Sequence, residues 1–124
     1  PGAPQAHVEL ADVYMSIEKT EKAIEEFNKA LEIDPLLADA LASLGDLYNL
    51  KESYDLAGNC YRRLVEIDPN NHSARFKLAE TYYHLGQLEK ALDEYLKVTE
   101  INDERTDALI RLGKIYSSLE KTVG

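Results

Sequence analysis

The stretch LGDLYNLKESYDLAGNCYRRLVEIDP, residues 44–69, decides the fold, because its main features recur every 34 residues along the chain. Its last four letters, EIDP, also occupy Glu32–Pro35, and the related EIND occupies Glu100–Asp103. A constant interval of this size indicates a chain built from repeated structural units that stack on one another.

Four columns of the repeat keep one register. Leucine occupies positions 10, 44, 78 and 112, and each is followed by alanine or glycine. Tyrosine occupies positions 14, 48, 82 and 116. Alanine at 23, 57 and 91 comes four residues before an aromatic residue, at 27, 61 and 95. Spacings of three and four residues bring side chains to one face of a helix, so each unit is predicted to contain two helices.

Short turns are predicted between the two helices of a unit, at residues 18–20, 51–53 and 85–87, and Gly86 is the only strong helix terminator among them. The EIDP segment is predicted to separate one unit from the next. A residue before proline is driven out of the helical region, and proline is tolerated in the first turn of a helix. We therefore expect EIDP to end one helical hairpin and to begin the next.

These residues resemble a known family. Leu44, Gly45 and Tyr48, followed by Ala57, Tyr61 and Pro69 in the same unit, look like the signature of the tetratricopeptide repeat, or TPR. The resemblance covers nearly the whole chain, taken as a single domain, 1–124, with repeats 4–37, 38–71 and 72–105 and a half repeat, 106–124. It implies an all-α, right-handed superhelix (an α-solenoid) of seven antiparallel helices, in which the first helix of each unit lines a concave groove. The tryptophan that the family often carries early in its first helix is missing here.

Composition argues against several kinds of partner. The formal net charge is −9, whereas nucleic-acid binding depends on clustered lysine and arginine, so we expect no nucleic-acid partner. No run of 18 apolar residues is present, so no membrane insertion is expected. Cys60 is the single cysteine and cannot form an internal disulfide, which favours a cytoplasmic location.

No pattern of an active site is present, so we expect no enzyme, no catalytic residue, no metal and no cofactor. His7, His72 and His84 do not have the spacing of ligands on one helix face. The predicted function is instead that of a protein-protein interaction scaffold, a binding surface for a protein or peptide segment.

The groove is predicted from columns of the first helices that lie outside the packing signature. The candidate groove residues are Val8, Asp12, Asp46, Asn49, Phe76, Lys77, Glu80, Tyr83, Ile110, Arg111 and Lys114. They describe an apolar floor with acidic residues toward the N-terminal half. Such a groove suits a segment with basic residues there and an apolar anchor near Phe76 and Tyr83.

One known TPR function is not expected. The carboxylate clamp of chaperone adaptors uses lysine, arginine and asparagine at set positions, which correspond here to Val8, Asp12, Ser43, Ser73 and Lys77. Only Lys77 has the required charge, and Asp12 would repel a carboxylate.

Two alternatives remain open. The chain could self-assemble as a homo-oligomer, because the last predicted helix has no partner helix and would leave an apolar stripe partly uncovered. The residues of that stripe are Ala108, Leu109, Leu112, Ile115, Tyr116 and Leu119. The chain could also be the non-catalytic arm of a larger enzyme.

Overall fold

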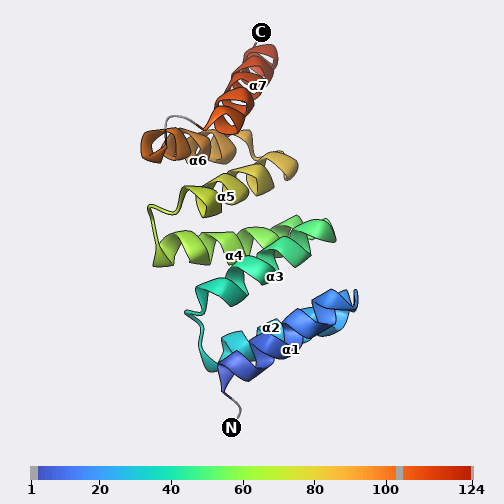
Figure 1. The fold of residues 1–124 in the computed structure, drawn as a ribbon. Coiled ribbons are helices and arrows are strands. Elements are labelled where there is room, and N and C mark those ends of the chain that lie inside the picture. The colour runs from blue at the N-terminus through green and yellow to red at the C-terminus, as the bar shows by residue number, and fades with distance from the viewer. Residues whose placement is uncertain (1–2, 103–104, 124) are drawn as a thin grey trace.

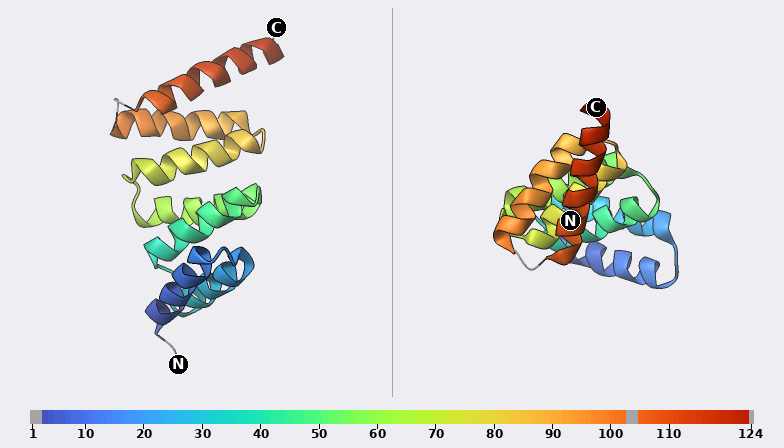
Figure 2. Two further views of the ribbon diagram at one scale, coloured as in Figure 1. Left: turned by 45° about the vertical axis from the view of Figure 1, so that its right-hand side comes forward. Right: turned by 90° about the horizontal axis from the view of Figure 1, so that it is seen from above.

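The computed structural model describes residues 3–102 and 105–123, which form seven α-helices and confirm the predicted all-α architecture. The helices are α1 (Pro4–Ser16), α2 (Thr20–Ile33), α3 (Ala38–Leu50), α4 (Tyr54–Ile67), α5 (His72–His84), α6 (Leu88–Ile101) and α7 (Thr106–Val123). They stack in chain order into one elongated array with the termini at opposite ends (Figure 1 and Figure 2). None of the described helices is both long enough and apolar enough to span a membrane.

The second helices α2, α4 and α6 hold the array together. Each packs against the first helix of its own unit and against the first helix of the next unit. Their aromatic residues Phe27, Tyr61 and Tyr95 are at most 1% exposed. Burying an apolar side chain of this size stabilises the folded state by about 1.5–3 kcal/mol, so the Ala-x-x-x-aromatic column supplies the main anchors of the core.

The small residue after Leu44 lets two helices approach closely, as predicted. A Cβ atom at Gly45 in α3 would lie 2.8 Å from Cε1 of Tyr61 in α4, a distance that real Cβ atoms do not tolerate. Glycine at this position is therefore required by the contact between the two helices of the second unit.

The EIDP segments end helices as predicted, because Ile33 and Ile67 are the last residues of α2 and α4. Asp34 and Asp68 then adopt extended conformations. The carboxylate of each aspartate accepts a hydrogen bond from the backbone N–H two residues later, at 3.1 and 3.2 Å respectively.

The prediction that proline lies in the first turn of the next helix is wrong. Pro35 and Pro69 lie in these turns, whereas the next helices begin only at Ala38 and His72. The aspartate side chain closes a turn around the proline, and each helix begins three residues after its proline. Asp103, which replaces proline at the third junction, lies outside the described residues.

The last helix is better covered than the sequence suggested. Ala108, Leu112 and Ile115 are 0%, 7% and 0% exposed, because α7 packs on α6 as the first helix of a further unit. The expectation that these three remain partly uncovered is wrong. Leu109 and Tyr116 do remain exposed, at 49% and 48%.

Candidate functional site on the face of the first helices

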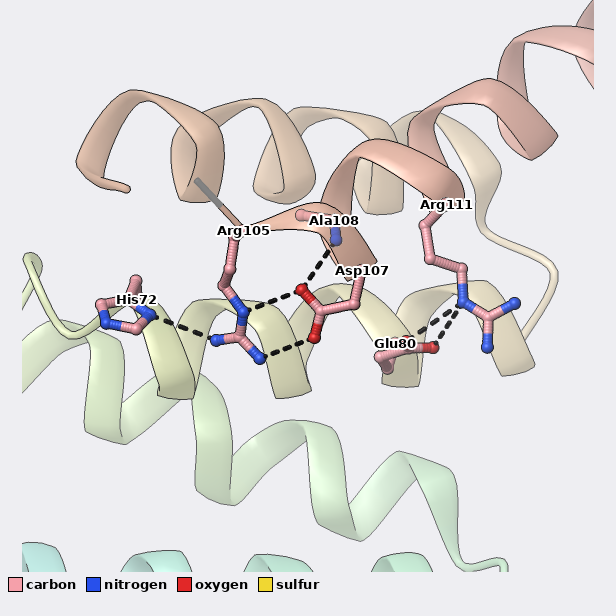
Figure 3. A network of polar contacts seen from close by, with 6 residues as sticks. All are labelled: His72, Glu80, Arg105, Asp107, Ala108 and Arg111. Atoms are coloured by element: carbon pink, nitrogen blue, oxygen red, sulfur yellow. Dashed lines mark hydrogen bonds and ion pairs between the residues drawn. The ribbon is translucent and has the colours of Figure 1, made fainter. Parts of the chain in front are cut away.

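Ion pairs connect the first helices α3, α5 and α7 across the repeats. Lys77 Nζ in α5 donates to both carboxylate oxygens of Asp46 in α3, at 3.0 and 3.1 Å. Arg111 Nε in α7 donates to both oxygens of Glu80 in α5, at 3.1 Å (Figure 3). In both pairs the cation follows its acid by 31 residues. Four predicted groove residues therefore already have partners within the chain. We call the two pairs, Asp46 with Lys77 and Glu80 with Arg111, the ion-pair ladder.

The ladder also orients its acids. The hydroxyl of Tyr61 donates to Asp46 Oδ1 at 2.5 Å, so this carboxylate is held from two sides. The Glu80 carboxylate beside Arg111 raises the pKa of that guanidinium above its ordinary value. Charges that neutralise one another over such short distances present little net charge to a partner.

The ladder does not extend to α1. The same 31-residue step from Asp12 leads to Ser43, which carries no charge. Glu9 and Asp12 are both exposed, and neither forms an ion pair with another side chain in the described part of the chain. Two unpaired negative charges of this face therefore lie on its first helix.

Both aromatic residues predicted as anchors are partly covered from within the chain. The Phe76 ring meets the edge of Tyr95, with ring centroids 5.7 Å apart, and the Arg105 guanidinium lies 4.1 Å from its centroid. The Tyr83 ring has the Arg111 guanidinium 4.8 Å from its centroid. Cation–π contacts of this kind stabilise the junction between α5 and α7, and they reduce the ring surface open to a ligand.

Arg105, which the sequence analysis did not identify, lies at the centre of this junction. Its guanidinium donates to both oxygens of Asp107, each at 3.0 Å, and to Nδ1 of His72 at 3.2 Å (Figure 3). Asp107 also accepts from the Ala108 N–H at 2.9 Å. The Arg105 hydrogen bonds hold the pKa of Asp107 below its usual value. The equivalent positions to Arg105 in the earlier repeats are leucine and asparagine, so no column could have indicated it.

A pocket of about 250 Å³ opens between α3 and α5. We call it the α3–α5 pocket, and its lining residues are Ala38, Asp39, Ala42, Leu64, Asn71, Ser73, Ala74 and Lys77. Lys77 was predicted as a groove residue, but most of the others were not. They come from helix ends and a connecting turn, and only the packing of adjacent units brings them together.

The remaining groove candidates are distributed unevenly. Val8 is only 9% exposed and belongs to the core of the first units, so its assignment to an open apolar floor is wrong. Ile110, in the same column, is 55% exposed because no further first helix lies beyond α7 among the described residues. Asn49 and Lys114 are exposed on α3 and α7.

Two further depressions occur at the junctions between units, away from the ladder. One of about 370 Å³ is lined by Pro35, Leu36, Arg63, Glu66 and Ile67. A second, of about 250 Å³, has the equivalent residues 34 positions later, together with Arg75. Because the same hollow recurs wherever an EIDP turn meets a second helix, it is a consequence of the repeat geometry.

The histidines and the cysteine have structural surroundings. His7 Nδ1 lies 2.8 Å from the Glu26 carboxylate, and the His84 ring stacks on Tyr54 with centroids 4.7 Å apart. Burial raises the pKa of the Cys60 thiol to about 11, which keeps it protonated and unreactive at neutral pH. Within residues 3–102 and 105–123, no three potential ligands are grouped to hold a metal ion.

Solved structures share this architecture. The first TPR of Spaghetti (RPAP3), bound to the HSP90 peptide SRMEEVD, is 20% identical with a TM-score of 0.82, over 94% of this chain and 93% of that chain. A MamA protein is 22% identical with a TM-score of 0.88, and MamA 41-end from Desulfovibrio magneticus RS-1 is 20% identical with a TM-score of 0.83. This chain spans 63% and 66% of those two MamA chains, with 94% of its own residues covered. At these identities the likeness concerns the fold.

Family membership rests on the sequence itself. A comparison with curated protein sequences gave no match. A family model described as TPR repeat matches residues 11–51 and 45–86, and a model described as tetratricopeptide repeat matches residues 72–105. Together these matches span more than half of the chain, which therefore belongs to the tetratricopeptide repeat family.

Proposed function

We propose that this chain is a protein-protein interaction scaffold that holds a peptide segment along the face of α1, α3 and α5. The observation that carries the proposal is the pairing of an unbalanced acidic helix with an adjacent pocket. Glu9 and Asp12 are exposed on α1, and the residue 31 positions after Asp12, which is the ladder step, is Ser43, the sequence neighbour of the pocket residue Ala42.

The chemistry of this surface favours a basic segment with an apolar side chain. Lysine or arginine of the ligand would pair with Glu9 and Asp12, which have no cation of their own in the described chain. An apolar side chain would enter the α3–α5 pocket between Ala42, Leu64 and Ala74. Phe76 and Tyr83, which are partly covered by arginine, would form the far edge of the surface.

This surface is less suited to binding a terminal carboxylate, as the clamp of chaperone adaptors does. At the positions that correspond to the clamp, Val8 is buried, Asp12 is acidic, and Lys77 already binds Asp46. A terminal carboxylate would therefore meet a negative charge and would have to compete for the one matching lysine.

Glu9→Gln combined with Asp12→Asn tests the proposal. The probe is an amidated, fluorescein-labelled peptide that alternates arginine with leucine, and its binding is measured by fluorescence anisotropy. Exposed ion pairs contribute roughly 0.2–1 kcal/mol each, so we expect the double variant to bind about three- to tenfold more weakly, with a smaller salt dependence. Neutralising these acids is a cleaner test than reversing Asp46 and Glu80, because the latter change would break the ladder.

The matched control is Glu32→Gln combined with Asp55→Asn, which removes the same charge from exposed positions on α2 and α4. The peptide SRMEEVD is the second probe and should not bind. Equal binding of the basic peptide to both double variants would remove the acidic end of α1 from the site, and tight binding of SRMEEVD would restore the clamp assignment.

Self-assembly through α7 is a second candidate, and the exposure of Leu109 and Tyr116 supports it. Leu112 and Ile115, the other strongly apolar residues predicted for an oligomer interface, are occupied in packing on α6. Leu119 is half-buried against the same cluster. A homo-oligomer would therefore have to use a narrower surface than the whole predicted stripe.

A further inference from the structure

The α3–α5 pocket lies between two junctions of first helices at which the equivalent positions carry larger side chains. Two of its lining residues are Ala42 on α3 and Asn71, just before α5. At the α1–α3 junction the equivalent residues, 34 positions earlier, are Val8 and Leu37, and both pack in the core cluster of the first units. The pocket therefore occurs where a small residue and a polar residue stand in place of two apolar side chains.

The α5–α7 junction shows a second way to fill this place. The residues equivalent to Ala42 and Asn71 are Phe76 and Arg105, and the guanidinium lies 4.1 Å from the centroid of the phenylalanine ring. Arg105 also bonds to His72 and Asp107, whose own equivalents line the α3–α5 pocket (Figure 3). Positions that enclose a hollow between α3 and α5 are thus joined by direct contacts between α5 and α7.

The apolar base of the pocket resembles the surface against which Phe76 packs. Leu64 and Ala74 line the pocket. Their equivalents, Val98 and Ala108, are both 0% exposed and belong to the cluster that the Phe76 ring contacts. An apolar ring that entered the pocket would therefore meet a base built from the same positions of the repeat.

The polar part of the pocket wall favours an aromatic ring over an aliphatic side chain. Asn71 accepts a hydrogen bond from the Ala74 N–H through its Oδ1 at 3.1 Å, and its NH₂ group has no partner in the described part of the chain. Ser73 adds a hydroxyl, and Lys77 of the ladder adds an ammonium group. Donors and cations are attracted to the negative face of an aromatic ring, as Arg105 is to Phe76.

We propose that the α3–α5 pocket binds an aromatic side chain of the peptide ligand, in the way that the neighbouring junction holds its own Phe76. This inference rests on the proposed function, because it names the apolar anchor of the peptide segment. The walls of the pocket come from the second and third hairpins and the turn between them, so neither end of the chain shapes it.

The first test uses a probe that does not need the acidic residues of α1. N-Acetylphenylalaninamide is titrated into the full chain, and the methyl NMR signals of Ala42, Leu64 and Ala74 are followed. N-Acetylleucinamide is the matched aliphatic probe. We expect saturable shifts with the phenylalanine amide and binding at least about threefold weaker with the leucine amide, because contacts of an aromatic ring add to its burial.

The second test uses the arginine–leucine peptide with its central leucine replaced by phenylalanine. It should bind at least about threefold more tightly than the original peptide, measured by fluorescence anisotropy. The two tests separate the proposals. Binding of the phenylalanine amide without binding of either peptide would overturn the peptide scaffold and support the aromatic pocket. Equal binding of the two peptides would support the scaffold and overturn the aromatic pocket.

Ala42→Phe fills the pocket from within the chain, as Phe76 does at the next junction. This variant should lose the methyl shifts with the phenylalanine amide and the preference for the phenylalanine peptide. Ala6→Phe makes the same change at an exposed position of α1 and should keep both. Circular dichroism shows whether each variant is folded.

The reciprocal variant, Phe76→Ala, does not depend on the folding of Ala42→Phe. Removing the ring should open an equivalent hollow between α5 and α7, so the phenylalanine amide should now also shift the methyl signals of Val98 and Ala108. The proposal is overturned if the leucine amide binds as tightly as the phenylalanine amide, or if folded Ala42→Phe still binds the latter. It is also overturned if Phe76→Ala gains no binding, because the two junctions would then not be equivalent.

Discussion

At the residue scale, the same backbone conformation is required of different amino acids in equivalent turns. Glu18, Glu52 and Gly86 occupy one column between the helices of a unit, and their φ angles are 59°, 61° and 77°. The left-handed region costs an ordinary residue roughly 1–2 kcal/mol and costs glycine almost nothing. The turn geometry therefore comes from the helix pair on either side of it, because two of the three turns form without glycine.

Two glycine-to-alanine changes should have opposite effects on stability. Gly86→Ala places a Cβ atom on a left-handed residue and should lower the free energy of unfolding by about 1 kcal/mol. Gly113→Ala lies in an open helical position and should raise it by about 0.5–1 kcal/mol, because alanine favours helix. Urea unfolding followed by circular dichroism measures both. Shifts of the same sign would mean that backbone conformation does not control these two sites.

At the element scale, α1 is attached to α2 through a nearly buried carboxylate. Glu26 is 6% exposed, and it interacts with His7 Nδ1 at 2.8 Å and with Lys29 Nζ at 3.1 Å. Hydrogen bonds from His7 and Lys29 lower the pKa of Glu26 below its model-compound value of 4.5, although burial acts in the opposite direction. The ionised form of Glu26 is therefore the one that joins the first two helices.

The contact predicts an acid-dependent contribution to stability. Because the folded-state pKa of Glu26 is depressed, its contribution is fully present above the unfolded-state pKa near 4.5 and is lost as the pH falls through the folded-state value. Glu26→Gln should thus destabilise the chain at neutral pH, and the difference from the original chain should shrink below about pH 4.5. Unfolding curves between pH 7 and pH 3 measure this difference, with the exposed Glu32→Gln as control. A difference that is independent of pH would show that ionisation of Glu26 is not what joins the helices.

At the scale of the whole molecule, coverage decreases toward both ends of the array. Leu10 and Val13 of α1 are 41% and 55% exposed, whereas the equivalent Leu44 and Leu47 of α3 are 2% and 6% exposed. At the other end, Leu109 and Tyr116 of α7 are 49% and 48% exposed. In a stacked array each unit is stabilised mainly by its immediate neighbours, so the terminal helices have fewer stabilising contacts.

Hydrogen exchange should follow this gradient. Backbone amides of α3, α4 and α5 should be the most protected, and those of α1 and α7 should exchange fastest, because the end helices open without disrupting the middle of the array. Exchange followed by mass spectrometry or NMR at neutral pH measures this directly. Protection that is uniform from α1 to α7 would indicate that the chain opens as one cooperative unit, contrary to the expectation from its packing.

The sequence by itself determined the helices, their order and the core anchors of this protein. These features are encoded by local spacing: Phe27, Tyr61 and Tyr95 follow alanine by four residues, and the isoleucines of the EIDP segments end their helices. Periodicity within one helix identifies which side chains share a face. The repetition of every column reinforces that information, so the family could be identified without coordinates.

Only the tertiary structure decided which charges remain free and which apolar residues remain exposed. Asp12, Asp46 and Glu80 look alike in the sequence, but Asp46 and Glu80 form ion pairs with cations 31 residues later, whereas the residue 31 positions after Asp12 is an uncharged serine. Likewise Leu112 is covered and Leu109 is open, although both belong to one apolar stripe. The physical reason is that these outcomes depend on how helices of different units are placed against each other, and the spacing within a single helix does not contain that information.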